Sequence, residues 1–319
     1  MTTERDKRSY PKKVHAYTTV ALLTLANVVA FVDRQIPAML VGPIKQDFNL
    51  SDSQMALLLG AAFSVSYALM ALPIGYAVDR LRRKDVLGSA LLVWSCMTLS
   101  AIFANSYAKL FGVRMGVAAG DAAFAPSSVS LVGDSFAEAE RGRALGMTTA
   151  GIYIGVGISF WGGGALIDYL TAIGGLTIPI VGYVKPWQAV FLMSGIPGLL
   201  LALAVFLLPE PPRAIATTQR QNNSGRSELR AHLTAHRVTL GLMFGGLIFM
   251  ALIFYSFAAW APSMMVRTFG LSIAEVGKSL GVITIISSIA GTIVAGMSVD
   301  WLSKKGYRDA PIRVAMCAC

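Results

Sequence analysis

Eight long apolar segments constrain the fold of this chain more than any other feature. They cover roughly residues 16–42, 55–77, 86–106, 108–132, 144–170, 187–209, 238–265 and 273–298. Each has about 20 residues or more, which at a helical rise of about 1.5 Å per residue is enough to cross a hydrocarbon core of ~30 Å. A ninth apolar segment begins near Pro311. The pattern predicts an all-α integral membrane protein.

Composition and charge narrow the possible classes of protein. Hydrophobic residues make up 55% of the 319 residues and charged residues only 14%, whereas a soluble domain carries about 25% charged residues. These values exclude an ordinary cytosolic enzyme, a disordered chain and a small disulfide-stapled domain. The net charge of +10 would suggest a nucleic-acid partner in a soluble protein, but here most basic residues lie between the apolar segments. We therefore expect membrane lipids around the chain and no nucleic acid.

Motifs of membrane enzymes and cofactor sites are missing from the sequence. It contains no H-E-x-x-H, G-x-S-x-G or Walker-type motif, and its three histidines and three cysteines form no metal-binding pattern. We expect a protein that is not an enzyme, with no metal and no cofactor.

The distribution of basic residues predicts the orientation in the membrane. One set of alternate loops holds most of the cations, among them Arg5, Lys7, Arg80, Arg82, Arg83, Lys84, Arg141, Arg143, Arg213, Arg237, Lys304 and Lys305. The other set contains only Lys45, Lys109, Lys185, Arg267 and Lys278. Because cytoplasmic loops carry the excess of Lys and Arg, the N-terminus is expected to be cytoplasmic.

A polar stretch divides the chain. Residues 210–237 follow six apolar segments and are expected to form a cytoplasmic linker between two bundles, residues 1–209 and 238–319. An internal repeat supports this division. The motif Gly75-x-x-x-Asp79 with following cations closes the second segment, and Gly296-x-x-x-Asp300 with following cations closes the eighth. Parallel six-helix repeats are a known design of transporters.

Four charges inside the apolar segments are the strongest functional signal. They are Asp33 and Arg34 in the first segment and Arg114 and Asp121 in the fourth. A charge at the bilayer centre costs about 2.5–3.5 kcal/mol, so these groups must pair or face water. They form either a structural ion-pair cluster or a pathway for substrate or protons, and charges in membrane spans favour the second interpretation.

The spacing of these residues predicts that they meet. Arg114 and Asp121 are seven residues apart, about two helical turns, and Asn27 and Arg34 share this spacing in an antiparallel segment. We expect Asp33 and Asp121 to carry protons. Arg34 and Arg114, with Asn27, are expected to bind an anionic headgroup, because the guanidinium fork matches carboxylate and phosphate. The alternative role of the two arginines is to control the carboxylates.

Other residues complete the candidate sites. Tyr67, Tyr153, Phe249 and Tyr255 are candidate cavity aromatics, for which ordinary helix packing is the alternative. The glycines at 112, 116, 120, 151 and 155 have the small-x-x-x-small spacing of close helix packing. A cytoplasmic gate is expected from charged turns, with mere topology signals as the alternative; its candidate residues are Gly75, Asp79, Arg80, Arg83, Asp134, Arg141 and Arg143.

The motifs together resemble the major facilitator superfamily, and within it the bacterial spinster-like branch. The segments that carry the resemblance are 31–36, Arg114 with 120–123, 141–146, 186–191, 210–213 and 259–277. The 75–84 turn is similar to the superfamily's signature loop, with Arg82 where glycine is common. The resemblance maps the family's intramembrane Asp-Arg pair onto Asp33 and Arg34, its fourth-helix arginine onto Arg114, and its coupling glutamate onto the shorter Asp121.

The resemblance implies a major facilitator fold of twelve spans in two bundles. The N-terminal six-helix bundle would be complete, and the C-terminal bundle would stop after two helices and the start of a third. We therefore expect a piece of a longer protein or a truncated product; an eight-span protein acting alone is disfavoured because its last helices would expose faces meant for partners.

The expected function is secondary active transport by alternating access, coupled to protons. The substrate would be an amphipathic or anionic small molecule, with a lysolipid, a sphingoid-like lipid or an organic anion favoured. The full-length protein would be a monomer in a bacterial inner membrane. The alternatives are a non-transporting receptor or scaffold on the same fold and an uncoupled facilitator.

Overall fold

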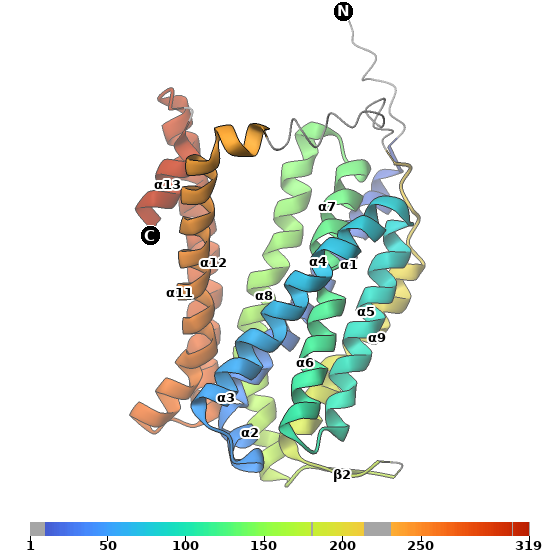
Figure 1. Ribbon diagram of the computed structural model, residues 1–319, viewed down its shortest axis with the longest axis vertical. Coiled ribbons are helices and arrows are strands. Elements are labelled where there is room, and N and C mark those ends of the chain that lie inside the picture. The colour runs from blue at the N-terminus through green and yellow to red at the C-terminus, as the bar shows by residue number, and fades with distance from the viewer. Residues whose placement is uncertain (1–9, 180, 214–230, 308, 319) are drawn as a thin grey trace, which may run out of the picture. The chain divides into compact units, whose positions relative to one another are not determined.

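The computed structural model describes residues 10–179, 181–213, 231–307 and 309–318, and they are mainly helical (Figure 1). The first part of the chain forms α1 (Lys13–Met39), α2 (Val41–Phe48), α3 (Asp52–Ala56), the π-helical turn η2 (Leu57–Ala61), α4 (Ala62–Arg80), α5 (Arg83–Ser100), η3 (Ala101–Phe103), α6 (Tyr107–Asp121), α7 (Phe124–Ser135), α8 (Glu138–Ala172) and α9 (Pro186–Phe206). It is followed by α11 (Arg237–Phe269), α12 (Ile273–Lys304) and α13 (Ala310–Ala318).

The predicted apolar segments are confirmed as helices. Within the described residues, eight helical stretches are long and apolar enough to cross a membrane. Three of them combine shorter elements: α3, η2 and α4 make one, α5 and η3 another, and α6 and α7 a third. The predicted ninth segment corresponds to α13, which begins at Ala310.

The all-α prediction missed one small hairpin. Strands β1 (Leu176–Ile178) and β2 (Gly182–Val184) pair antiparallel after α8. Gly174 and Gly175 adopt positive φ angles of 73° and 94° there and end the helix, as glycine does readily. Strands of three residues are too short to show the alternation on which a strand prediction depends.

Glycines bring the helices of the first part close together. A Cβ on Gly116 or Gly120 would collide with α5, and one on Gly151 or Gly155 would collide with the backbone of α1. The packing of α1 on α8 and of α5 on α6 and α9 is accordingly extensive. The predicted small-residue packing is therefore confirmed at these four glycines; a Cβ on Gly112 would meet open space.

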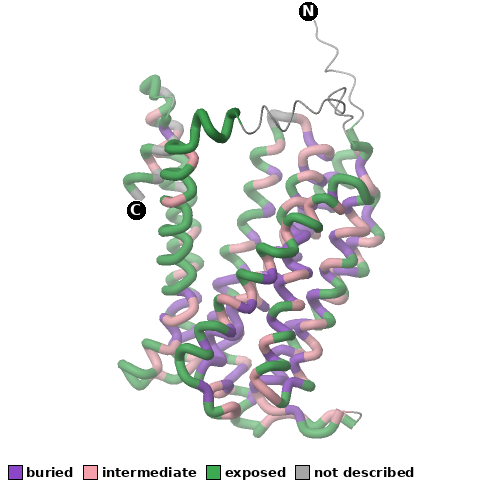
Figure 2. The backbone as a smooth tube through the Cα atoms, in the orientation of Figure 1, coloured by how far each residue is buried: buried purple, intermediate pink, exposed green. Residues whose placement is uncertain are grey.

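Buried residues concentrate where these helices face one another (Figure 2). Many large apolar side chains are exposed. Leu72, for example, is 84% exposed, which suits a surface that faces lipid. The buried set also contains four charged residues, Asp33, Arg83, Arg114 and Asp121.

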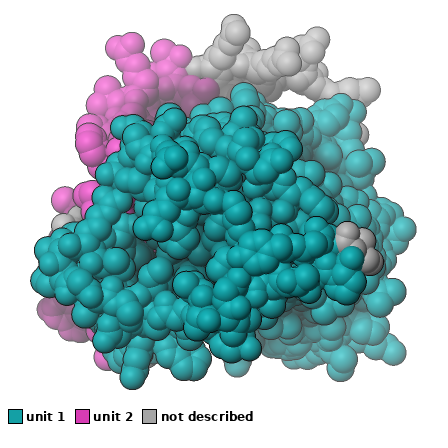
Figure 3. Space-filling view, turned by 90° about the horizontal axis from the view of Figure 1, so that it is seen from below, with its two compact units in different colours: residues 1–212, 261–290 teal, residues 213–260, 291–319 magenta. Residues whose placement is uncertain are grey.

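The chain forms two compact units, coloured separately in Figure 3. Unit 1 contains residues 1–212 and 261–290, and unit 2 contains residues 213–260 and 291–319. Residues 237–257 of unit 2 are almost entirely exposed. The predicted division at a linker remains a prediction, and most of that linker, residues 214–230, lies outside the described residues.

Unit 1 has two ends that matter for its function. We call the end with α2, β1 and β2 the hairpin end, and the opposite end, where α4 turns into α5, the Arg83 end (Figure 1).

Candidate functional site

Two interruptions of helical regularity lie beside the intramembrane charges. The π-helical turn η2 immediately precedes Phe63 in α4, and π-helical turns are frequent at functional sites. The fourth span breaks after Asp121, and α7 restarts at Phe124. Pro126 explains the break, because proline lacks an N–H and its ring clashes with the carbonyl four residues earlier. A broken span of this kind is typical of transporter binding sites.

Arg34 and Asp121 form an ion pair across the first and fourth spans. Arg34 Nη2 donates to Asp121 Oδ2, and their side chains are 18% and 8% exposed. The predicted meeting of the two segments is therefore confirmed for this pair. Gly120 helps to place it, because the absence of a side chain lets α6 approach Trp94 of α5 closely.

An aromatic residue joins the two arginines. The Cζ atom of Arg34 lies 4.4 Å from the ring centroid of Phe63 and 4.6 Å from that of Phe31. Arg114 Cζ lies 5.6 Å from the same Phe63 ring, and Tyr67 stacks on it at 6.0 Å. Phe63 was not among the predicted site residues, since one phenylalanine in an apolar span carries no signal of its own.

Arg114 is buried without a full set of partners. It is 2% exposed, and none of the described residues accepts a hydrogen bond from its Nε or Nη1. A buried donor that is left unbonded costs free energy, and more so when it is charged. This guanidinium is therefore suited to receive an anion.

Asp33, the neighbour of Arg34, faces a different set of helices. Its Oδ2 accepts hydrogen bonds from Trp94 Nε1 at 2.8 Å and Thr98 Oγ1 at 2.9 Å, and its Oδ1 accepts one from Ser194 Oγ at 3.2 Å. All three donors are neutral groups on α5 and α9, and Asp33 is 1% exposed.

The other predicted binding residues lie on α1, α8 and α11. Asn27 is buried and donates from Nδ2 to the carbonyl of Thr148 in α8, at 2.8 Å. Tyr153 is 40% exposed on α8. Phe249 and Tyr255 belong to unit 2, where they are 70% and 47% exposed. Tyr67 stacks on Phe63, whose ring contacts both Arg34 and Arg114.

A second buried arginine organises the Arg83 end. Arg83 is 1% exposed and pairs with Asp134 of α7 and with Glu210, whose Oε1 accepts from Nε at 2.8 Å. Its Nη1 also donates to Ser130, and its Nη2 donates to the carbonyl of Pro211 at 2.7 Å. Glu210 was predicted as the start of the linker and not as part of this cluster.

Glu210 also caps the N-terminus of α5. Its carboxylate accepts hydrogen bonds from the backbone N–H groups of Arg83 and Lys84, at 3.2 and 3.0 Å. Burial raises the pKa of Glu210, but the bonds from Arg83 and Lys84 outweigh this effect, so the pKa lies below its usual value.

The remaining gate candidates are less buried than Arg83. Arg80 is exposed and covers the ring of Tyr76 at 3.9 Å. Asp79 and Arg143 are exposed, and Gly75 is half-buried. Arg141 donates from Nε to the carbonyl of Phe136, at 3.0 Å. The structure thus joins Arg83 with Asp134 and leaves the other predicted gate contacts untested. Among the described residues, no three His, Cys, Asp or Glu side chains lie close enough to hold a metal ion.

Known proteins resemble the chain over most of its length. It is 27% identical to an MFS-type efflux pump of Mycolicibacterium smegmatis, over 96% of this chain and 67% of that protein. It is also 27% identical to a probable L-galactonate transporter of Escherichia coli, over 93% of this chain and 64% of that protein.

A solved structure of similar fold is a bacterial homologue of the human lysosomal transporter spinster, in an inward-facing and unoccupied conformation. The TM-score is 0.76 at 27% identity, covering 92% of this chain and 64% of that one. The spinster-like resemblance is therefore confirmed, and the chain spans about two thirds of the length of these relatives. Residues 23–319 match the Major Facilitator Superfamily. With its multiple apolar spans, this chain belongs to the Major Facilitator Superfamily.

Proposed function

We propose that this chain is the substrate- and proton-binding part of a secondary active transporter for a small organic anion. The observation that carries the proposal is the ion pair of Arg34 with Asp121 beside a buried Arg114 that has two unbonded donors. An anion at Arg114 would satisfy those donors. A proton on Asp121 would remove the charge that holds Arg34.

The chemistry of the cluster favours a carboxylate substrate. A guanidinium binds a carboxylate through two parallel hydrogen bonds, which supplies both affinity and orientation. The relative named as a probable L-galactonate transporter supports a sugar acid or a similar organic acid. An amphipathic anionic lipid is the second candidate, because the rings of Phe31, Phe63 and Tyr67 lie beside the charges and suit an apolar chain.

Asp121 is the first choice for the coupling carboxylate. Its partner Arg34 is also a candidate substrate ligand, so proton and substrate binding are linked at one ion pair. Asp33 remains the second candidate. Its three donors are neutral, so its proton would affect Arg34 less directly.

The proposed setting is a bacterial inner membrane, with the protein acting as a monomer. The excess of cations supports a cytoplasmic location of the Arg83 end and an outer location of the hairpin end. The Arg83, Asp134 and Glu210 cluster would then brace the cytoplasmic side of the bundle.

Proton-driven uptake in sealed proteoliposomes tests the proposal. With a galactonate-type sugar acid as substrate, a pH gradient should drive accumulation by the unaltered protein, and Asp121→Asn should reduce it to the level of empty vesicles. Asp85→Asn is the matched control, because Asp85 is a half-buried partner of Arg82 at 3.6 Å on the Arg83 end.

Each alternative has its own result. Flux that ignores the pH gradient in the unaltered protein would indicate an uncoupled facilitator. Saturable binding without flux would indicate a receptor. Full gradient-driven uptake by Asp121→Asn would reject the coupling role of Asp121.

A further inference from the structure

A cavity of about 340 Å³ lies at the hairpin end of unit 1, between the end of α1 and helices α2, α11 and α12. A volume of this size is within the range of small-molecule binding sites. None of the described residues that line the cavity belongs to the cluster of Arg34, Phe63, Arg114 and Asp121. Ala38, which lines it, follows Arg34 by about one helical turn, so the cavity is a separate space on the hairpin-end side of that cluster.

A glycine on α2 leaves room for the cavity. Lys45 and Gln46 follow Gly42 by three and four residues, so the three residues share the face of α2 that lines the cavity. A Cβ on Gly42 would meet no neighbouring atom within 4 Å. On α11, Ser263 and Arg267 are four residues apart and likewise share a lining face. The hollow therefore depends on the missing side chain at position 42.

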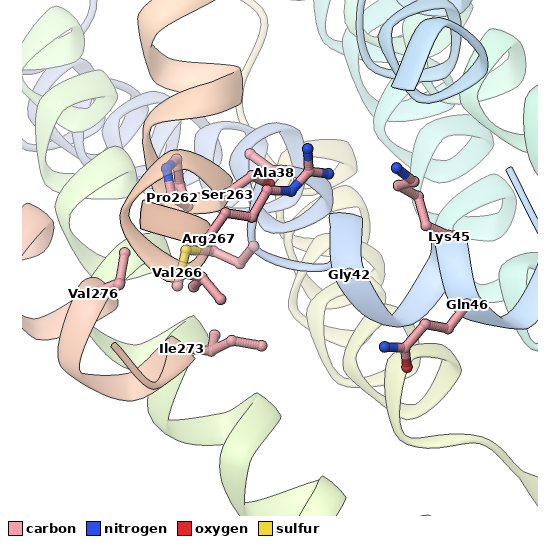
Figure 4. Close-up of a pocket in the computed structure, with 11 residues that line it drawn as sticks. Ala38, Gly42, Lys45, Gln46, Pro262, Ser263, Val266, Arg267, Ile273 and Val276 are labelled. Atoms are coloured by element: carbon pink, nitrogen blue, oxygen red, sulfur yellow. The ribbon is translucent and has the colours of Figure 1, made fainter. Parts of the chain in front are cut away.

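The lining is apolar where it is buried and polar where it is exposed. Met39 and Val276 are 4% and 0% exposed, whereas Gln46 and Arg267 are exposed. Figure 4 shows Lys45 and Arg267 extending toward each other from α2 and α11. A mainly apolar pocket with a few polar groups binds the apolar part of a ligand and fixes its orientation through the polar part.

The two cations of the cavity share one carboxylate. Asp52, at the start of α3, accepts from Arg267 Nη2 at 2.8 Å and Nη1 at 3.1 Å, and from Lys45 Nζ at 2.6 Å. Two N–H groups of Lys45 and the Nε of Arg267 remain, and they donate to none of the described residues. No acidic residue is among the described residues that line the cavity. Two positive charges therefore meet one negative charge, which favours a ligand with a single negative charge.

Asp52 holds these cations only weakly. The side chains of Asp52 and Arg267 are 52% and 48% exposed, so water competes with their ion pair. A ligand carboxylate can replace Asp52 without breaking a buried contact. The apolar part of the ligand would gain contacts with Val266 and Ile273 that Asp52 does not provide.

We propose that this cavity is a second ligand site, which binds an amphipathic monocarboxylate. The carboxylate accepts hydrogen bonds from Lys45 and Arg267 in competition with Asp52, and the apolar part lies against Val266 and Ile273. A carboxylate suits the site because the Arg267 guanidinium already binds one of the chain's own carboxylates through two bonds. The site does not include the central arginines, so the proposal does not depend on the proposed function.

Equilibrium dialysis with tritiated 2-naphthoate tests the site. The full chain in nanodiscs would carry Arg114→Met, so that the central cluster contributes little to binding. One saturable site per chain is expected. Acetate, which lacks the apolar part, should compete at least about 100-fold more weakly. The neutral analogue 2-naphthylmethanol should compete about tenfold more weakly, because it cannot form charged hydrogen bonds.

Three variants locate the ligand. Arg267→Met should weaken binding about tenfold, through the loss of a charged hydrogen-bond donor. Gly42→Leu should abolish saturable binding, because its side chain would fill the cavity. Asp52→Asn should strengthen binding about fivefold, since it removes the competing carboxylate charge. A purely structural role of Asp52 would not produce this gain of affinity.

Lys185→Met and Asp47→Asn are the matched controls. Lys185 pairs with Asp47 of α2 at the hairpin end, as Lys45 pairs with Asp52, but neither Lys185 nor Asp47 is among the residues that line the cavity. Both variants should leave the affinity for 2-naphthoate unchanged. They separate an effect at the cavity from a general change of charge at this end.

Two results would overturn the site. One is equal binding of 2-naphthoate and 2-naphthylmethanol, which would show that the charge is not recognised. The other is an unchanged affinity in Arg267→Met and Gly42→Leu, with both variants eluting like the unaltered protein in gel filtration. If Asp52→Asn weakens binding as Arg267→Met does, Asp52 helps to hold the ligand and the proposed competition is wrong.

Discussion

Arg83 and Arg114 are buried to almost the same extent, 1% and 2% exposed, yet their surroundings differ completely. Every nitrogen of the Arg83 guanidinium donates to a carboxylate, a hydroxyl or a carbonyl. Two nitrogens of Arg114 donate to none of the described residues. Equal burial therefore supports opposite roles: Arg83 completes a structural network, and Arg114 is available to a ligand.

Position within the helix explains the difference. Arg83 lies in the first turn of α5, near free backbone donors and the chain segment after α9, so Glu210 can bind the side chain and the helix end together. Arg114 lies in the middle of α6, where every backbone carbonyl is used by the helix. Only side chains or a ligand can satisfy it there.

The largest expected effect is the loss of Arg83. Arg83→Met should lower the free energy of unfolding by about 3–5 kcal/mol, because Asp134 and Glu210 would lose the cation that compensates their charge. Thermal and denaturant unfolding in detergent would measure it. Arg82→Met is the control, since Arg82 is 63% exposed and its replacement should cost less than ~1 kcal/mol. Equal losses in the two variants would contradict the structural role of Arg83.

Arg114→Met should give the reverse pattern. The free energy of unfolding should change by less than ~1 kcal/mol, because few native bonds are lost. Affinity for the organic anion should fall at least ~10-fold, since a charged hydrogen bond contributes about 1.5–3 kcal/mol. Isothermal titration would measure binding, with Lys109→Met as a control at an exposed site near the start of the same helix. If Arg114→Met destabilised the protein and left the affinity for the anion unchanged, Arg114 would have a structural role like that of Arg83.

Glu210 should make the Arg83 end sensitive to acid. Because its pKa in the folded protein lies below the usual value, its contribution is complete above the usual pKa and is lost as the pH falls through the lowered one. Glu210→Gln should therefore cost about 1–2 kcal/mol at pH 7 and progressively less towards pH 3. Melting temperatures across this range would show it, with the exposed Glu140→Gln as control. If the difference in melting temperature between Glu210→Gln and the unaltered protein stays the same at acid pH, this explanation is wrong.

The smallest expected effect concerns the ring of Phe63, which contacts both Arg34 and Arg114. Phe63→Leu should weaken anion binding about threefold, which corresponds to a cation–π contribution of about 0.5–1 kcal/mol. Phe111→Leu is a suitable control, because the ring of Phe111 contacts Tyr107 and lies over no arginine in the part of the chain that the structure describes. An unchanged affinity in Phe63→Leu would show that the ring only packs against the guanidinium groups.

Much of the fold followed from hydropathy, because a helix in lipid must be long, apolar and internally hydrogen-bonded. The eight spans were predicted on this basis, and the glycines at 116, 120, 151 and 155 predicted close packing. The π-helical turn before Phe63 and the β-hairpin were not predicted. The π-helical turn is a local change in backbone hydrogen bonding, and the hairpin follows two glycines with positive φ angles. Neither feature changes the hydropathy pattern.

The sequence predicted which charged residues belong to the candidate site, but it did not predict most of their contacts. Asp33, Arg34, Arg114 and Asp121 stand out because charge in an apolar span is costly. That Arg34 pairs with Asp121 while Asp33 turns to Trp94, Thr98 and Ser194 depends on how α1 is rotated against its neighbours. Phe63 and Glu210 were missed as members of their clusters because their contacts also join elements that are distant in the sequence.

The sequence alone determined that the chain forms membrane-spanning helices and which charges lie within them, because the cost of polar groups in hydrocarbon acts on each segment separately. Only the tertiary structure decided which charges are satisfied. Hydrogen bonding requires atoms from different helices to approach within about 3 Å, and spacing along one helix cannot specify that distance. That Arg83 is fully hydrogen-bonded while Arg114 keeps two unbonded donors among the described residues therefore became clear only when the helices were packed.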